Sequence, residues 1–119
     1  MSVTRNEVDQ ICAALPGATL AHPPELVSWK VGGKMFACFG GEADMQGVSL
    51  KTPDTDTATM LIDAGAAVKA PYFHKSWVRL PFEATDISEV THRSAISYDI
   101  IRKSLPKATR DALPNRTEG

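Results

Sequence analysis

Residues 26–39 read Leu-Val-Ser-Trp-Lys-Val-Gly-Gly-Lys-Met-Phe-Ala-Cys-Phe, so two apolar runs are separated by a Gly-Gly pair. Glycine adopts the positive φ angles of a two-residue turn without strain, and this pattern therefore predicts an antiparallel β-hairpin. The turn also sets a register, because residues at equal distances from it face each other. The predicted cross-strand pairs are Val31 with Lys34, Trp29 with Phe36 and Val27 with Cys38.

Three helices are predicted around this hairpin from side chains that cap exposed backbone amides. Thr4 and Glu7 have the spacing of a capping box, Thr52 precedes Pro53 at a first helical position, and Asp86 begins the last helix. Apolar residues at helical spacing then mark the sides that face the core. They are Val8, Ile11, Cys12 and Leu15 in the first helix, Ala58, Leu61 and Ile62 in the second, and Ile87, Val90, Ala95, Tyr98, Ile101 and Leu105 in the third.

The remaining strands complete an α+β domain. Residues 46–51 alternate as a third strand, and two shorter runs at 68–72 and 77–80 are expected to form a second hairpin. The predicted order is α-β-β-β-α-β-β-α, with an antiparallel sheet covered by helices. Pro106 ends the last helix or allows one further turn through Leu113. We expect a single domain over residues 1–113 and a frayed tail over 114–119.

Composition is that of one globular domain. The 119 residues are 43% hydrophobic and 23% charged, which excludes a disordered chain. No run reaches the ~18 apolar residues of a membrane span, and the N-terminus lacks the apolar core of a signal peptide, so we expect a cytoplasmic protein without membrane contact. Cys12 and Cys38 are expected to be reduced and buried. A monomer is the default expectation.

The charge balance is nearly neutral, with a net charge of -1 and a pI of about 6.3. No overall charge therefore draws the protein onto nucleic acid or anionic lipid. Residues 26–80 are mildly basic, with six basic side chains against five acidic ones.

Several short motifs together resemble a known family. They are Leu15-Pro16-Gly17-Ala18, Trp29, Lys34-Met35-Phe36-Ala37, Val48-Ser49-Leu50-Lys51, Trp77-Val78, Ser97-Tyr98 and Lys103-Ser104-Leu105-Pro106-Lys107. In order and spacing they are similar to the MmcQ/YjbR-like family of small bacterial domains. The resemblance implies a frataxin-like (CyaY-like) α+β sandwich with two protruding hairpins, a double wing proposed to bind DNA. The wings implied here are the turn at residues 32–34 and the loop at His74-Lys75.

Basic side chains on the predicted strands and wings give a candidate DNA-binding surface through phosphate contacts. They are Lys30, Lys34, Lys51, Lys69, His74, Lys75 and Arg79. The competing interpretation is that these residues only keep strand edges soluble. Trp29 and Trp77 could stack on a base where exposed, although we expect both in the core.

Two other functional classes stay open. A small ligand could lie in a cleft lined by Ser49, Lys51, Tyr72 and Tyr98. A protein partner could instead contact the exposed parts of Met35, Phe39 and Phe73. The surface potential and the presence of a closed apolar pocket distinguish these classes from DNA binding.

Catalytic and metal-binding motifs are lacking in the sequence. There is no Gly-x-Ser-x-Gly, phosphate loop or dinucleotide fingerprint, so we expect no enzyme activity and no cofactor. His22, His74 and His92 have no metal-ligand spacing, and Glu89-x-x-His92 is only a fragment of a di-metal site. No metal centre is predicted.

Overall fold

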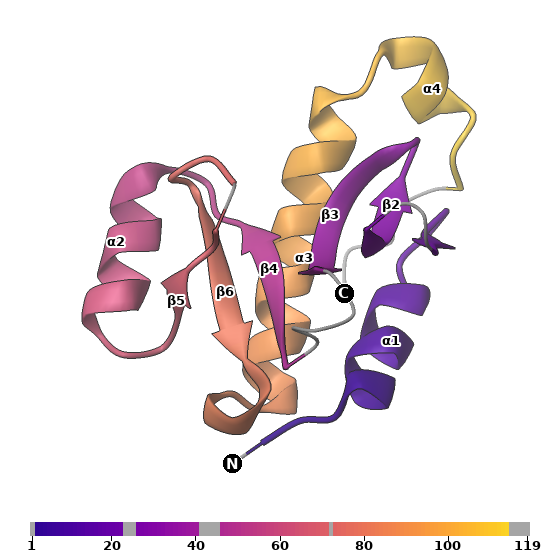
Figure 1. The fold of residues 1–119 in the computed structure, drawn as a ribbon. Coiled ribbons are helices and arrows are strands. Elements are labelled where there is room, and N and C mark those ends of the chain that lie inside the picture. Colours follow the sequence, from indigo (N-terminus) through magenta and orange to yellow (C-terminus); the bar gives the residue numbers. More distant parts are fainter. Residues whose placement is uncertain (1, 23–25, 41–45, 72, 115–119) are drawn as a thin grey trace.

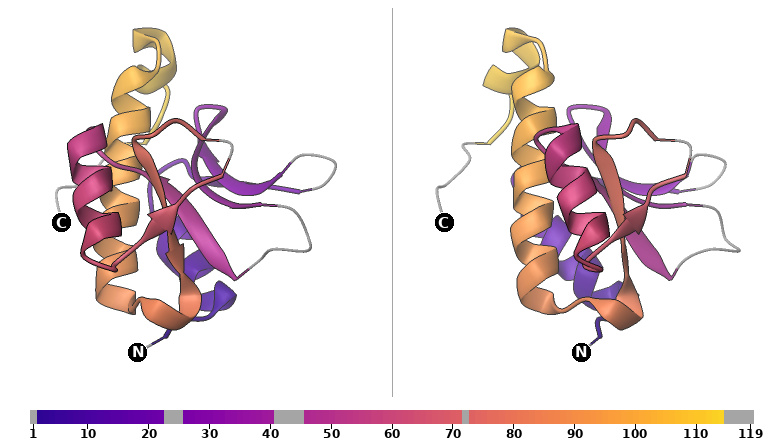
Figure 2. Two further views of the ribbon diagram at one scale, coloured as in Figure 1. Left: turned by 60° about the vertical axis from the view of Figure 1, so that its left-hand side comes forward. Right: turned by 90° about the vertical axis from the view of Figure 1, so that its left-hand side faces the viewer.

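The computed structural model describes residues 2–22, 26–40, 46–71 and 73–114. It contains a six-stranded antiparallel sheet with its helices on one side (Figures 1 and 2). The elements are α1 (Arg5–Ala13), β1 (Thr19–Ala21), β2 (Val27–Val31), β3 (Lys34–Gly40), β4 (Gly47–Lys51), α2 (Thr55–Asp63), β5 (Val68–Lys69), β6 (Trp77–Pro81), the 3-10 turn η1 (Phe82–Ala84), α3 (Ile87–Ser104) and α4 (Lys107–Asp111). The α+β prediction is confirmed.

The sheet has the strand order β1-β2-β3-β4-β6-β5. Both predicted hairpins are present, because β2 pairs with β3 and β5 pairs with β6. The short edge strand β1 was not predicted, and Thr19 pairs there with Lys30. Helix α4 is the further turn that Pro106 allowed. Of the predicted tail at 114–119, residues 115–119 lie outside the described residues.

The predicted register of the first hairpin is correct only next to the turn. Val31 pairs with Lys34, but Trp29 pairs with Ala37 instead of Phe36, and the register shifts again between Val27 and Ser28, which pair with Gly40 and Cys38. Two residues of β3, Phe36 and Phe39, therefore have no partner in β2, and each of them forms a β-bulge.

The two bulged residues explain the shifts. Phe36 meets the ring of Tyr98 on α3 edge to face, with 5.4 Å between centroids. Phe39 meets Phe82, with 6.3 Å between centroids, and the guanidinium of Arg5 on α1 lies 3.9 Å above its ring. Residues three apart in a regular strand point to opposite faces. The bulges let both phenylalanines reach the helical side.

Two of the three predicted helix starts are confirmed. The Thr4 hydroxyl accepts from the Glu7 amide at 3.2 Å, and the Glu7 carboxylate accepts from the Thr4 amide at 2.8 Å, which completes the capping box. The Asp86 carboxylate accepts from the Glu89 amide at 2.8 Å. Local sequence was sufficient here because each cap spans only three residues.

The predicted cap of the second helix was wrong. Asp54, not Thr52, is the N-cap, and its carboxylate accepts from the Thr57 amide at 2.7 Å. The Thr52 hydroxyl is buried and donates to the carbonyl of Ser76 at 2.6 Å. Aspartate is at least as good a cap as threonine, and it leaves Thr52 free to join two strands.

Helix α3 covers the centre of the sheet. Its Ser97 hydroxyl donates to the carbonyl of Phe36 at 2.6 Å and accepts from the amide of Lys51 at 2.9 Å, so one side chain ties α3 to β3 and β4. Of the apolar positions predicted to be buried, Ile62 and Ile87 are 37% and 49% exposed. Ile62 lies in the last turn of α2 and Ile87 in the first turn of α3. Cys12 and Cys38 are buried thiols that are not joined in a disulfide, as predicted.

None of the helices in the described part of the chain has the length and apolar character that a bilayer-spanning segment needs.

Candidate nucleic-acid interface

Strand direction brings the predicted lysines to one end of the sheet. In an antiparallel sheet, β2, β4 and β5 end where β3 and β6 begin (Figure 1). Lys51, the last residue of β4, pairs with Trp77, the first of β6, and Lys69 ends β5 beside Val78. Lys30 and Lys34 flank the first hairpin turn, and Lys75 lies in the loop before β6. We call Lys30, Lys34, Lys51, Lys69 and Lys75 the basic end of the sheet.

Acidic side chains gather at the opposite end. Several lie where β6, α2 and α3 have the termini that point away from the basic end, namely Asp63, Glu83, Asp86 and Glu89. Asp54 and Asp56 at the start of α2, and Asp111 in α4, lie nearer the basic end. The domain is therefore polarised in charge, although its net charge is only -1.

The five lysines differ in how they are held. Lys34, Lys69 and Lys75 are exposed, whereas Lys30 and Lys51 are half-buried. The ammonium of Lys51 donates to the hydroxyl of Ser76 at 2.7 Å. Lys51 is thus engaged in holding the loop before β6, and the exposed lysines are better placed to meet a ligand.

Arg79 lies apart from the basic end. Its guanidinium reaches from β6 across β4, where Nη1 donates to Ser49 Oγ at 3.3 Å and Nη2 donates to the carbonyl of Phe39 on β3 at 3.1 Å. These contacts hold three strands together. The structure therefore does not bring Arg79 to the same surface as the other predicted site residues.

The loop before β6 is fixed by a network that sequence reasoning did not predict. His74 Nδ1 accepts from the Ser76 amide at 3.1 Å and lies 2.9 Å from the Ser76 hydroxyl. Because an amide can only donate, Nδ1 is an acceptor, and the neutral imidazole carries its proton on Nε2. The amide of Trp77 donates to the His74 carbonyl at 2.9 Å. His74 and Lys75 therefore have a defined position at the basic end.

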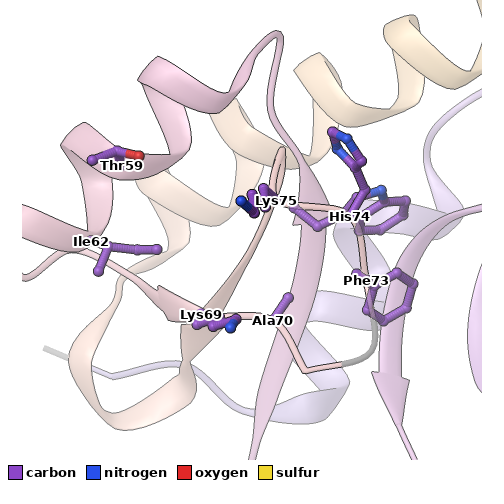
Figure 3. A pocket seen from close by; sticks show the side chains of 8 residues that line it. Thr59, Ile62, Lys69, Ala70, Phe73, His74 and Lys75 are labelled. Carbon is purple, nitrogen blue, oxygen red and sulfur yellow. The ribbon is translucent and has the colours of Figure 1, made fainter.

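A pocket of about 300 Å³ opens beside this loop, between α2 and β5 (Figure 3). Its described lining residues are Thr59, Ile62, Lys69, Ala70, Phe73, His74, Lys75 and Trp77. The rings of Phe73 and Trp77 stack with 4.5 Å between centroids and 25° between planes. Sequence reasoning missed the pocket because it depends on how α2 docks beside β5. The only signal was the aromatic and basic character of residues 73–77.

The first implied wing rests against helices. Gly32 and Gly33 have φ angles of 57° and 84°, as a two-glycine turn predicts. A Cβ on Gly32 would lie 2.5 Å from Leu105 Cδ1 and 3.0 Å from Thr109 Cγ2, so the turn packs closely on the junction of α3 and α4. Lys34 remains exposed beside it.

The residues suggested for a ligand cleft do not converge. Tyr98 is fully buried, and its hydroxyl donates to the Pro16 carbonyl at 2.5 Å while accepting from Arg102 at 2.7 Å. Ser49 is held by Arg79 on β6, and Tyr72 lies outside the described residues. The three described members of that set, Ser49, Lys51 and Tyr98, therefore form no shared cleft.

The suggested protein-contact surface also lacks one of its members. Phe39 is fully buried, so the prediction of an exposed part was wrong, whereas Met35 and Phe73 are half-buried. Among residues 2–22, 26–40, 46–71 and 73–114, no group of three metal-ligating side chains was found.

The architecture is that of a small α+β domain with helices on one side of an antiparallel sheet. The family model YjbR matches residues 13–100, and the chain belongs to this family, which confirms the resemblance inferred from its motifs. The crystal structure of the Deinococcus radiodurans protein DR2400, with the family domain DUF419, is similar with a TM-score of 0.80 and 24% identity, over 98% of this chain and 93% of that chain. That likeness shows a shared fold. No curated protein matched the sequence.

Proposed function

We propose that this YjbR domain binds nucleic acid through phosphate contacts made by the basic end of the sheet. The observation that supports the proposal is the convergence of five lysines from four strands and one loop on a single end of the sheet, with Asp63, Glu83, Asp86 and Glu89 at the other end. Lysine side chains that neutralise phosphates release counterions, which supplies most of the affinity in binding without sequence preference.

The spacing of the two implied wings suits a nucleic-acid backbone. Lys34 begins β3, and Lys75 precedes β6, two strands away in the sheet. Neighbouring strands lie ~4.8 Å apart, so the two strands are separated by about 10 Å. That separation is comparable with the ~6 and ~12 Å widths of the grooves of B-DNA. Both lysines can therefore reach phosphates of one bound molecule.

The contacts that the basic end can make would orient a nucleic-acid backbone and would not distinguish its base sequence. The lysines of the basic end lie at strand ends and in a loop, and none of these five is on a helix. Phosphate contacts set orientation and affinity, whereas base-edge contacts carry specificity. We expect modest affinity with little sequence preference.

The test is the salt dependence of binding, followed by fluorescence anisotropy of a labelled oligonucleotide duplex. With about four to six phosphate contacts, log affinity should fall with log salt concentration at a slope of roughly -4 to -5. Replacing Lys34 and Lys75 together by Ala should reduce the magnitude of that slope by about 2, because two contacts are lost.

A matched control makes the same change in net charge elsewhere. Gln10→Glu with Ser88→Glu also lowers the net charge by two, by adding two carboxylates at exposed positions of α1 and α3. This variant should keep the slope of the wild type. The proposal is wrong if the wild type binds no DNA at low salt, or if the lysine variant and the control behave alike.

A further inference from the structure

We infer that the pocket between α2 and β5 accepts one unpaired nucleobase, with its phosphate held at the rim, so that the domain prefers single strands to duplex. This inference rests on the proposed function and names the form of nucleic acid that the same basic end would bind. It is carried by the shape of the pocket, its aromatic wall and the charges around it.

The size and apolar lining of the pocket suit a flat ring. Its volume of about 300 Å³ lies at the lower limit of ligand pockets, which run from about 300 to 1,000 Å³. Ile62 and Ala70 give it apolar surface, and the stacked pair of Phe73 and Trp77 gives it an aromatic wall. Every base has a π-face, so stacking on such a wall tolerates any sequence.

The charged side chains among the described lining residues of the pocket are both lysines. Figure 3 shows Lys69 and Lys75 between Thr59 and Ile62 of α2 on one side and Phe73 and His74 on the other. None of the described lining residues is acidic. A second pocket, beside β6, contrasts with it, because Glu83 lines that pocket together with Arg79. Of these two pockets, only the one between α2 and β5 is lined by aromatic and lysine side chains without an acidic one. Proteins that bind single strands use aromatic side chains to stack a base and basic side chains to bind its phosphate.

The aromatic wall is positioned before any ligand arrives. The loop that carries it is tied to β4 by three contacts to Ser76: its hydroxyl accepts from Lys51 at 2.7 Å, and its carbonyl accepts from the amide and the hydroxyl of Thr52 at 2.8 and 2.6 Å. The exposed His74 ring adds an N–H donor at Nε2 on the same loop. Residues 74–77, which these contacts hold in place, lose little conformational entropy on binding, and this favours affinity.

Duplex DNA cannot use this pocket without losing a base pair. A paired base would have to unstack and turn outward, which carries an energetic cost that a single strand avoids. The same lysines can therefore contact the phosphates of single-stranded and of duplex DNA, whereas the pocket adds affinity only for a strand with unpaired bases. We expect a 12-residue thymidine strand to bind about tenfold more tightly than a duplex of equal length at the same salt concentration.

The fluorescence of Trp77 reports occupation of the pocket. The chain has two tryptophans, and Trp29 is buried with its indole N–H donated to Asp9 at 2.9 Å. The thymidine strand should quench the wild-type emission, and a Trp77→Phe variant, in which only Trp29 remains, should show no quenching. Thymidine monophosphate should give the same quenching only at much higher concentration, since it lacks the neighbouring phosphates that the lysines contact.

A pocket-filling variant separates this inference from the proposed function. Thr59→Phe places a ring at the pocket from an exposed position on α2 without changing charge, and Thr91→Phe makes the same change on α3, away from the pocket. We expect Thr59→Phe to abolish the quenching and the single-strand preference while duplex binding keeps its salt slope. Thr91→Phe should behave as wild type.

Three results would overturn the inference. Salt-dependent binding with equal affinity for strand and duplex and no quenching would reject the pocket but leave the proposed function standing. Tighter binding of thymidine monophosphate than of the strand would assign the pocket to free nucleotides. Failure of every nucleic acid to bind would reject both proposals.

Discussion

The two glycines of the first hairpin turn allow a sharp test of how that turn is held. Both have positive φ angles, so alanine at either should lose about 1 to 2 kcal/mol of stability through backbone strain. The reduced freedom of the unfolded chain offsets about 0.4 to 1 kcal/mol of this loss in each variant. Gly33→Ala should therefore cost about 1 kcal/mol, because nothing lies within 4 Å of its new Cβ.

Gly32→Ala should cost more, since its Cβ would meet Leu105 Cδ1 at 2.5 Å and Thr109 Cγ2 at 3.0 Å. Leu105 is buried and has little room to move, and overpacking of this kind costs about 1 to 3 kcal/mol. The expected total is about 2 to 4 kcal/mol. The difference between the two variants isolates the packing of the turn against the α3–α4 junction.

The measurement is urea unfolding followed by tryptophan fluorescence, with the midpoint converted to a free energy at a common slope. Leu105→Ala in the Gly32→Ala background provides the control, because it removes the atoms that the new Cβ would strike. That double variant should lose less stability than the sum of its two single variants. Equal losses for Gly32→Ala and Gly33→Ala would refute the packing described for the turn.

Two further predictions follow from perturbed ionisable groups. The hydrogen bond from the Thr57 amide lowers the pKa of the Asp54 carboxyl, so Asp54 stabilises the fold above its unfolded pKa of about 3.9 and less so as pH falls through its folded pKa. The stability advantage of wild type over Asp54→Ala in urea should therefore be constant at neutral pH and shrink below about pH 4; an advantage independent of pH would contradict the cap. Burial raises the pKa of the Cys12 thiol to about 12, and Cys38 is 1% exposed. Neither thiol should react with Ellman's reagent at pH 8 until urea is added, and rapid labelling of Cys12 in buffer would show that the α1–α3 contact opens.

Features set by neighbouring residues were predictable from the sequence. The glycine turn and the caps at Thr4 and Asp86 each depend on groups within a few positions along the chain, and the structure confirms them. The register of the hairpin was not predictable in this way. Alternation along β3 gives no sign of bulges at Phe36 and Phe39, which follow from packing against residues about 45 to 60 positions away.

The candidate site was also predictable only in part from the sequence. The residue types were sufficient to identify the basic candidates, but the convergence of the lysines follows from strand direction. Arg79 differs from them because its guanidinium is bound to Ser49 and to the Phe39 carbonyl. Ser76 was not nominated, because its role depends on Lys51, twenty-five residues earlier in the chain. The pocket required knowledge of the docking of α2, which no local pattern contains.

The central position of α3 has a consequence for synthesis of the protein. Strands β1 to β4 leave the ribosome before α3, whose Ser97 and Tyr98 contact β3 and β4. At ~5 to 20 residues per second, the roughly 50 residues from the end of β4 to the end of α3 take about 3 to 10 s to add. During that interval the apolar side of a nascent four-stranded sheet lacks its principal cover. This interval is when the chain is most exposed to chaperones and to association with other nascent chains.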